Sequence, residues 1–260
     1  MGKKSVFIKF APALLLMLSS CVCTQTNKRA EVIATYTATP VNVDGKLDEE
    51  MWKKTQAYVM KHSRNAWNDS PKTVRKFFQN GVVEPGYIRL LWNKDYLYIG
   101  VEFFDDDIIA EGKADEESHF LLGDVAEVFI KPLTEPWYWE LYVTPLGHKT
   151  SYFYKYPGRG WIPSFLTIGT LTKMQTAASV SGTLNDLKDK DRKWTAEMAI
   201  PIGQIGDAGE KLSPEVPWLI FFGRYNYSYY LPVPEHSSFP YQERGNYHFL
   251  DDYGILKMLK

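Results

Sequence analysis

The chain has 260 residues, with 30 Lys and Arg against 31 Asp and Glu, so its net charge is close to zero. A nucleic-acid-binding protein usually shows a basic excess or a basic face, so this composition excludes nucleic acid as the expected partner. The length suits one large all-β domain. The 8 Trp, 17 Tyr and 14 Phe are typical of strands and of binding surfaces.

The first 20 residues have the pattern of a secretory signal peptide. Lys3 and Lys4 precede an apolar stretch at 6–18, interrupted by Lys9, which is shorter than the ~20 apolar residues of a membrane-spanning helix. The run Leu18-Ser19-Ser20-Cys21 resembles a bacterial lipobox. This resemblance implies that Cys21 carries lipid and that the exported protein is anchored to the cell envelope, most simply the outer membrane. Ordinary signal cleavage is the alternative.

The segment that follows the signal peptide is polar and unpatterned. We expect residues 21–31 to be a tether and residues 32–260 to form one domain. The two cysteines, Cys21 and Cys23, both precede that domain. The domain therefore has no disulfide, although an exported protein could form one.

From residue 32 onward, apolar and polar residues alternate with the period of β-strands. We expect strands at 87–92, 96–103, 125–131, 138–144, 149–154, 176–182, 194–200, 219–225 and 254–259. Short helices are expected at 48–54 and 201–205. Many short strands separated by polar turns predict an all-β, antiparallel β-sandwich or barrel.

Four long connections are expected, at 65–86, 119–123, 156–165 and 227–246. Loops longer than ~12 to 15 residues are usually functional or disordered. The last connection carries five aromatic residues, which are rare in disordered segments. We expect it to form a wall or lid beside a site. The aromatic residues are Tyr227, Tyr229, Tyr230, Phe239 and Tyr241.

Four segments in order resemble the family 9 carbohydrate-binding modules. Their sequences are VDGKLDE at 43–49, LWNKDYLYIGV at 91–101, GDVAEVFI at 123–130 with WELYVTPLG at 139–147, and GTLND at 182–186 with WTAEMAIP at 194–201. The resemblance covers about residues 32–260 and implies a β-sandwich of the jelly-roll kind, related to the DOMON domains. It also implies binding of a glycan without catalysis.

The resemblance implies that two aromatic side chains hold a sugar ring between them. The first family aromatic, a Trp, falls at Leu121, with Phe120 beside it, and the second falls at Tyr247. The axial C–H groups of a pyranose form an apolar face that packs on such rings. Leu121 departs from the family pattern, so we expect weak binding unless Phe120 or a loop aromatic supplies the missing wall.

Polar residues on neighbouring strands complete the expected site. The family's polar ligand matches Glu127, and a position where sugar-binding members carry Arg matches Tyr142. Arg224 is a replacement cation or, alternatively, one partner of a structural ion pair, since a guanidinium in an apolar strand needs a carboxylate. Glu140 shares a face with Tyr142, which is either a binding face or an ordinary outer face.

Other residues have both a structural and a functional interpretation. His248 is either a structural histidine or a part of the site, and Glu127 could simply point to solvent. Trp52 and Trp92 are expected in the core, whereas Trp137 and Trp161 adjoin loops and are candidates for sugar stacking.

Family members carry structural calcium, and hard cations bind several oxygens, so Asp44 and Asp48 are candidate ligands. The alternative is that Asp44 belongs to a tight turn and Asp48 caps a helix.

Three functions remain open, with glycan binding by an envelope lipoprotein that serves polysaccharide degradation or uptake as the leading one. A glycoside hydrolase would need two carboxyls ~5 to 5.5 Å or ~6.5 to 9.5 Å apart, for which Glu127 and Glu140 are candidates. A DOMON-like haem protein would need axial ligands such as His248 or Met, but the chain has no CxxCH motif. The leading function requires no cofactor.

Overall fold

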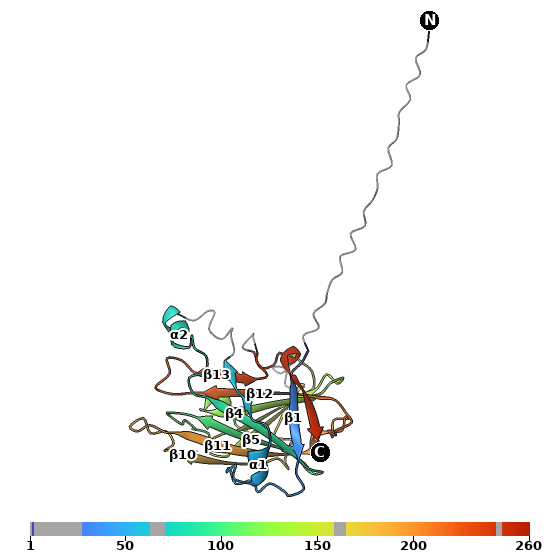
Figure 1. The fold of residues 1–260 in the computed structure, drawn as a ribbon, viewed down its shortest axis with the longest axis horizontal. Helices are drawn as coiled ribbons and strands as arrows, with labels where there is room; N and C mark the ends of the chain where they lie inside the picture. The colour runs from blue at the N-terminus through green and yellow to red at the C-terminus, as the bar shows by residue number, and fades with distance from the viewer. Residues whose placement is uncertain (1, 3–27, 63–70, 159–164, 243–245) are drawn as a thin grey trace.

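The computed structural model describes residues 2, 28–62, 71–158, 165–242 and 246–260. Its strands pair into one sheet that curls into two facing layers (Figure 1). The predicted signal peptide, Cys21, most of the tether and Trp161 lie outside the described residues.

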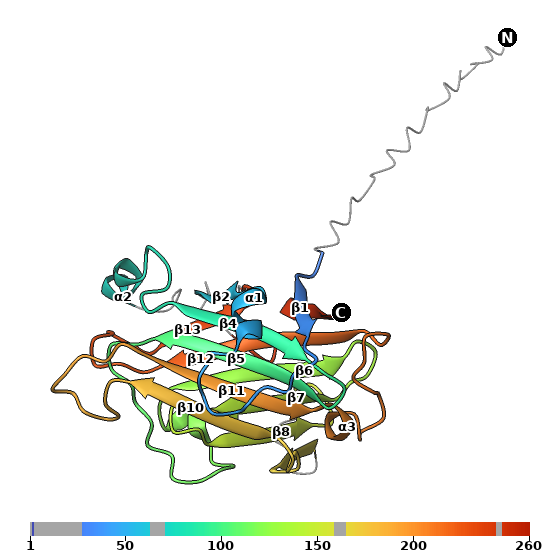
Figure 2. The same ribbon diagram turned by 60° about the horizontal axis from the view of Figure 1, so that its bottom comes forward.

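Each layer is an antiparallel array of strands. The first layer has the order β10 (Gln175–Ser181), β11 (Lys193–Pro201), β5 (Tyr96–Phe104) and β4 (Gly86–Trp92). The second has the order β14 (Gly254–Leu259), β12 (Trp218–Asn226), β6 (Val125–Pro132), β7 (Tyr138–Val143), β8 (Lys149–Tyr154) and β9 (Leu166–Ile168). Figure 2 shows the first layer crossing in front of β6, β7 and β8. The all-β sandwich expected from the sequence is confirmed.

A single strand, β1 (Glu31–Tyr36), joins the two layers. It runs parallel to β14 on one side and parallel to β4 on the other. The alternation in the sequence predicts antiparallel layers correctly, but it contains no information about this parallel connection.

The main core lies between the layers. On β5, the side chains of Leu97, Ile99, Val101 and Phe103 all face inward and are buried, as their period-2 spacing predicts. Trp92 is buried in the same core, as expected. Trp137 is buried there too, against the ring of Trp218 at 5.6 Å. Its expected role in sugar stacking is therefore wrong.

The helix α1 (Glu50–Lys54) lies on the outer side of the first layer (Figure 2) and buries Trp52, as expected. The Trp52 indole donates a hydrogen bond to Glu197 Oε1 at 2.9 Å, while the backbone N–H groups of Asp44 and Gly45 donate to Glu197 Oε2. A Cβ on Gly45, whose φ is +83°, would lie 2.3 Å from the backbone of Ala178. Through these hydrogen bonds to Glu197, the segment 43–49 and helix α1 are held against β11.

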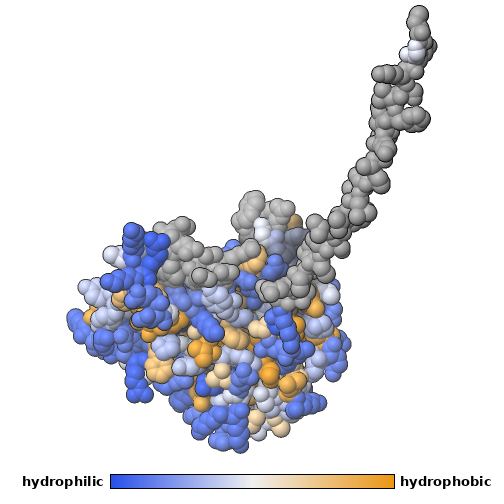
Figure 3. Space-filling view, turned by 45° about the horizontal axis from the view of Figure 1, so that its top comes forward, coloured by the Kyte–Doolittle hydropathy of each residue, from blue (hydrophilic) through white to orange (hydrophobic). Residues whose placement is uncertain are grey.

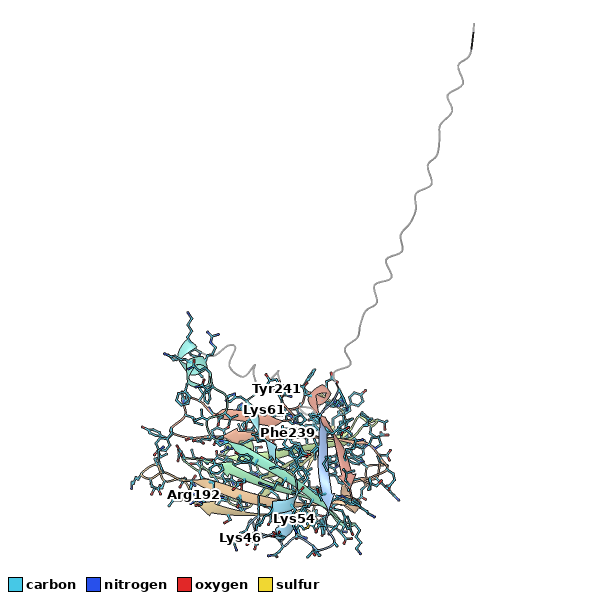
Figure 4. The ribbon with its side chains drawn as sticks, in the orientation of Figure 1. Lys46, Lys54, Lys61, Arg192, Phe239 and Tyr241 are labelled. Atoms are coloured by element: carbon cyan, nitrogen blue, oxygen red, sulfur yellow. The ribbon has the colours of Figure 1, made fainter. Side chains whose placement is uncertain are left out.

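Two expected loops contain regular structure. The segment 65–86 holds α2 (Lys72–Phe77), and the segment 227–246 holds β13 (Glu235–Phe239), which pairs with β12 and β3 (Lys61–His62). Figure 4 places Lys61, Phe239 and Tyr241 close together at this end. The remaining elements are β2 (Tyr58–Val59), α3 (Ile202–Ile205), and the 3₁₀ turns η2 (His119–Leu121) and η4 (Leu250–Asp252).

The face of the molecule in Figure 3 carries hydrophilic side chains with apolar residues scattered among them. Within the described part of the chain, the helices are too short and too polar to cross a membrane.

Candidate functional site

A second cluster of aromatic residues covers the outer face of the second layer. Alternation places Val125, Glu127 and Phe129 of β6 on this face, and it does the same for alternate residues of β7, β8 and β12. Tyrosine dominates the cluster, and the rings of Tyr138 and Tyr154 stack at 4.6 Å. A face that is this aromatic on the side away from the core needs its own cover or a ligand.

The chain from 246 to 253 and the turn η2 provide part of that cover. Tyr247 is 6% exposed, and its hydroxyl lies 2.9 Å from the Ser237 carbonyl oxygen and 3.1 Å from that of Arg224. Its ring occupies the space above Gly223, where an added Cβ would approach the ring to 2.5 Å. The geometry therefore makes Tyr247 a buried part of the cover, with no face open for sugar stacking.

A pocket of about 300 Å³ remains open beside this cover. Such a volume is at the lower end of ligand pockets, ~300 to 1,000 Å³. Aromatic rings and a few polar groups form its wall. The described lining residues are Ser118, Phe120, Glu140, Tyr142, Tyr152, Tyr154, Leu166, Ile168, Tyr225 and His248.

Phe120 contributes an aromatic ring to this wall, whereas its neighbour Leu121 is 68% exposed and does not line the pocket. The Phe120 ring lies 6.4 Å from that of Tyr142 and 6.2 Å from that of Tyr225. Phe120 therefore supplies the aromatic ring that is missing at position 121, where the family pattern has a Trp.

Two glutamates and a tyrosine hydroxyl form the polar centre of the site. Glu127 pairs across the strands with Tyr142, and the Tyr142 hydroxyl donates a hydrogen bond of 2.5 Å to Glu140 Oε1. Burial raises the pKa of Glu127 well above its usual range, and the nearby Glu140 carboxylate raises it further. Glu127 is buried and does not line the pocket, so among the described residues a single carboxylate, that of Glu140, reaches the ligand space.

The tyrosines around this centre are hydrogen-bonding phenols. Burial raises the pKa of Tyr138, Tyr142 and Tyr154, so their hydroxyls stay protonated at neutral pH. The Tyr138 hydroxyl lies 2.9 Å from His248 Nδ1, and His248 Nε2 lies 3.9 Å from Glu140 Oε2. The half-exposed imidazole therefore stands at the rim of the pocket.

Arg224 lies on the opposite side of its strand from the pocket. It shares the inward-facing parity of Phe222, and its side chain is fully buried. Its guanidinium donates to Asp105 Oδ2 at 3.1 Å and to the carbonyl oxygens of Glu84 and Phe104 at 2.7 and 2.9 Å. The expected replacement cation is thus one half of a structural ion pair.

The structure therefore brings together four of the seven expected ligand-binding residues. Phe120, Glu140, Tyr142 and His248 line one pocket, Glu127 and Tyr247 lie buried next to it, and Arg224 is separated from it by the sheet.

The sequence prediction missed three other tyrosines of the pocket wall, two from β8 and one from β12. Tyr152 and Tyr154 pair across the strands with Glu140 and Tyr138, so register could have found them. Tyr225 shares the parity of Gly223 and Phe221 on the same face.

The expected calcium ligands lie in the loop ahead of α1. The Asp44 oxygens accept hydrogen bonds from Lys46 N and Asn42 Nδ2, which is the pattern of a turn. Lys46, whose ammonium lies 3.7 Å from Asp44, is at the same end of the molecule as Lys54 (Figure 4). No cluster of three or more potential metal ligands occurs among the residues that the structure describes. Calcium binding at Asp44 and Asp48 stays a prediction.

Comparison with known proteins gives structural likeness only. No protein-family model matches the chain, and no curated protein sequence matches it. A crystal structure from Bacteroides uniformis, provisionally designated a carbohydrate-binding protein, is 12% identical, with a TM-score of 0.63 over 88% of this chain and 99% of that chain.

Two structures of a family 9 carbohydrate-binding module from Caldicellulosiruptor kristjanssonii are each 14% identical over 88% of this chain. For the complex with cellotriose, the TM-score is 0.49 and the match covers 93% of that chain. For the complex with glucose, the TM-score is 0.48 and the match covers 95% of that chain. The likeness to the Bacteroides uniformis structure confirms the fold that the four sequence segments predict: this chain is a β-sandwich of the kind found in that protein.

Proposed function

We propose that the protein binds a glycan in the pocket between Phe120 and the tyrosines of β7 and β8, without catalysis. The observation that carries this proposal is a small pocket whose wall combines aromatic rings, phenol hydroxyls and one buried carboxylate. Aromatic rings match the apolar face of a sugar, and the polar groups match its hydroxyls. The provisional designation of the Bacteroides uniformis structure supports the same function.

The cellular setting is a further part of the proposal. The lipobox at 18–21 supports an exported lipoprotein, held at the envelope through Cys21, that captures glycan for a degradation or uptake system. Among the described residues of the pocket wall there is one carboxylate, which favours binding over hydrolysis, because a glycosidase needs two carboxyls at the scissile bond.

Isothermal titration calorimetry, preceded by a glycan-array screen, tests the binding function. For any glycan found, Phe120→Ala should weaken binding, because stacking contributes ~0.5 to 1.5 kcal/mol beyond burial, which is a factor of about 2 to 12 in Kd. Tyr229→Ala is the matched aromatic control, since Tyr229 is 73% exposed and lies outside the pocket wall. If Phe120→Ala binds as tightly as the control, the glycan does not occupy this pocket.

A further inference from the structure

The pocket contains a negative group without a complete set of partners. The Glu140 side chain is only 4% exposed. Its Oε1 accepts the hydrogen bond from Tyr142, and the Tyr154 hydroxyl also interacts with this carboxylate, whereas the buried Oε2 has no partner with good hydrogen-bond geometry in the described part of the chain. The 3.9 Å contact from His248 is longer than a hydrogen bond. A buried carboxylate oxygen of this kind is costly unless a donor or a cation completes it.

Among the residues that the structure describes, none supplies a permanent cation to this oxygen. The described lining residues of the pocket include neither Lys nor Arg. Arg224, which the sequence analysis named as a candidate cation for the site, forms an ion pair with Asp105 on the other side of the sheet. Burial raises the pKa of Glu127 well above its usual range, and the neighbouring Glu140 raises it further.

The rings around Glu140 add to this preference. Tyr142, Tyr152, Tyr154, Phe120 and Tyr225 all line the same pocket. The negative face of an aromatic ring attracts a cation within about 6 Å of its centre, and it does so more strongly away from water. Rings and carboxylate together form an environment suited to a small ammonium group attached to an apolar ring.

We propose that this pocket selects a sugar that bears a free, protonated amine, such as a 2-amino-2-deoxyhexose unit, with the ammonium directed at Glu140 Oε2. This inference rests on the proposed glycan-binding function and names its substrate class. The ammonium would donate to the unpartnered oxygen, and the sugar ring would pack against Phe120 and the tyrosines.

Calorimetry with three monosaccharides that differ only at position 2 tests the inference. Glucosamine, N-acetylglucosamine and glucose carry an ammonium, an amide and a hydroxyl there. At about pH 7, below the ~7.7 to 8.0 typical of an α-amino group, the full chain should bind glucosamine about tenfold more tightly than glucose, because charge-assisted hydrogen bonds are roughly twice as strong as neutral ones. Glu140→Gln should reduce this ratio to near one.

The outcomes separate the inference from the function on which it rests. Equal or tighter binding of glucose or N-acetylglucosamine, or binding of none of the three sugars, would overturn the ammonium preference, whereas only a glycan-array screen in which no glycan binds would also overturn the proposed function. A ratio that is unchanged in Glu140→Gln would also overturn the role of Glu140. If that variant fails to fold, added salt decides the question in the wild-type protein: it should weaken glucosamine binding and leave glucose binding unaffected.

Discussion

Replacing Arg224 by Met should destabilise the protein strongly without acting on the pocket. The change removes the guanidinium but keeps an unbranched apolar side chain over the Phe103 ring, whose centre lies 4.6 Å from the guanidinium carbon. It leaves the fully buried Asp105 carboxylate without its cation, and the carbonyl oxygens of Glu84 and Phe104 without their donor.

The expected magnitude follows from this list of lost partners. Removing one member of a buried ion pair costs ~3 to 5 kcal/mol. For a domain of ~150 to 250 residues, each kcal/mol lowers Tm by ~2 to 4 °C, so Arg224→Met should lower Tm by about 6 to 20 °C. Thermal unfolding followed by circular dichroism, together with urea titration, measures this effect.

A double-variant cycle identifies the cause. Asp105→Asn removes the charge that Arg224 neutralises, so Arg224→Met combined with Asp105→Asn should be less destabilised than the sum of the two single variants. Glycan affinity of the folded Arg224→Met protein should match that of the wild type. A fall in Tm of less than about 2 °C, or additive single effects, would refute the ion-pair argument, and a selective loss of glycan binding would place Arg224 in the site.

Two further predictions concern the N-terminus and the buried carboxyls. Cys21→Ser should abolish incorporation of labelled fatty acid and release the protein to the soluble fraction; continued labelling would disprove the anchor. Burial raises the folded-state pKa of Glu127 well above its usual range and that of Glu197 to about 7. The contribution of these two groups to the free energy of unfolding is therefore fully present below pH ~4.5, and it is lost as the pH rises through the folded-state pKa values. Buried His236, whose pKa is lowered to about 4, opposes this below ~6.5, so Tm should be higher near pH 6.5 than near pH 8. Glu127→Gln should reduce that difference, and an equal or higher Tm near pH 8 would contradict the assignment.

Most of the fold could be predicted because nearly every strand has one apolar face. All nine expected strands are present, with ends within one residue of those predicted. The short strands β2, β3 and β9, the strand β1 and the strand β13 were not predicted. In β13, two of the three inward residues, Glu235 and Ser237, are polar and only Phe239 is apolar, so the strand shows no apolar alternation. The sequence also cannot show that β1 pairs parallel with two strands, because pairing partners leave no mark on a single strand's pattern.

The site could be predicted only in part. Strand parity places Glu140 and Tyr142 on one face, and the same parity argument applied to β12 would have placed Arg224 with Phe222 on the inner face. By contrast, whether Phe120 or Leu121 faces the pocket depends on the turn η2, for which no periodic pattern exists. The burial of Tyr247 depends on the missing side chain at Gly223, one strand away, and that contact is visible only in three dimensions.

The parallel strand β1 also determines the order in which the molecule can assemble. Its partner β14 comes from the far end of the domain, and Arg29, just before β1, donates hydrogen bonds to carbonyl oxygens 221 to 224 positions away. Hairpins such as β4–β5 and β6–β7 are local and can form early, whereas contacts of such long range form slowly. In a chain that is synthesised from its N-terminus, the edge of β1 that pairs with β14 therefore has no partner until residues 254–259 have been made. During that interval the chain exposes a strand edge, a state in which a holding chaperone would protect it from aggregation.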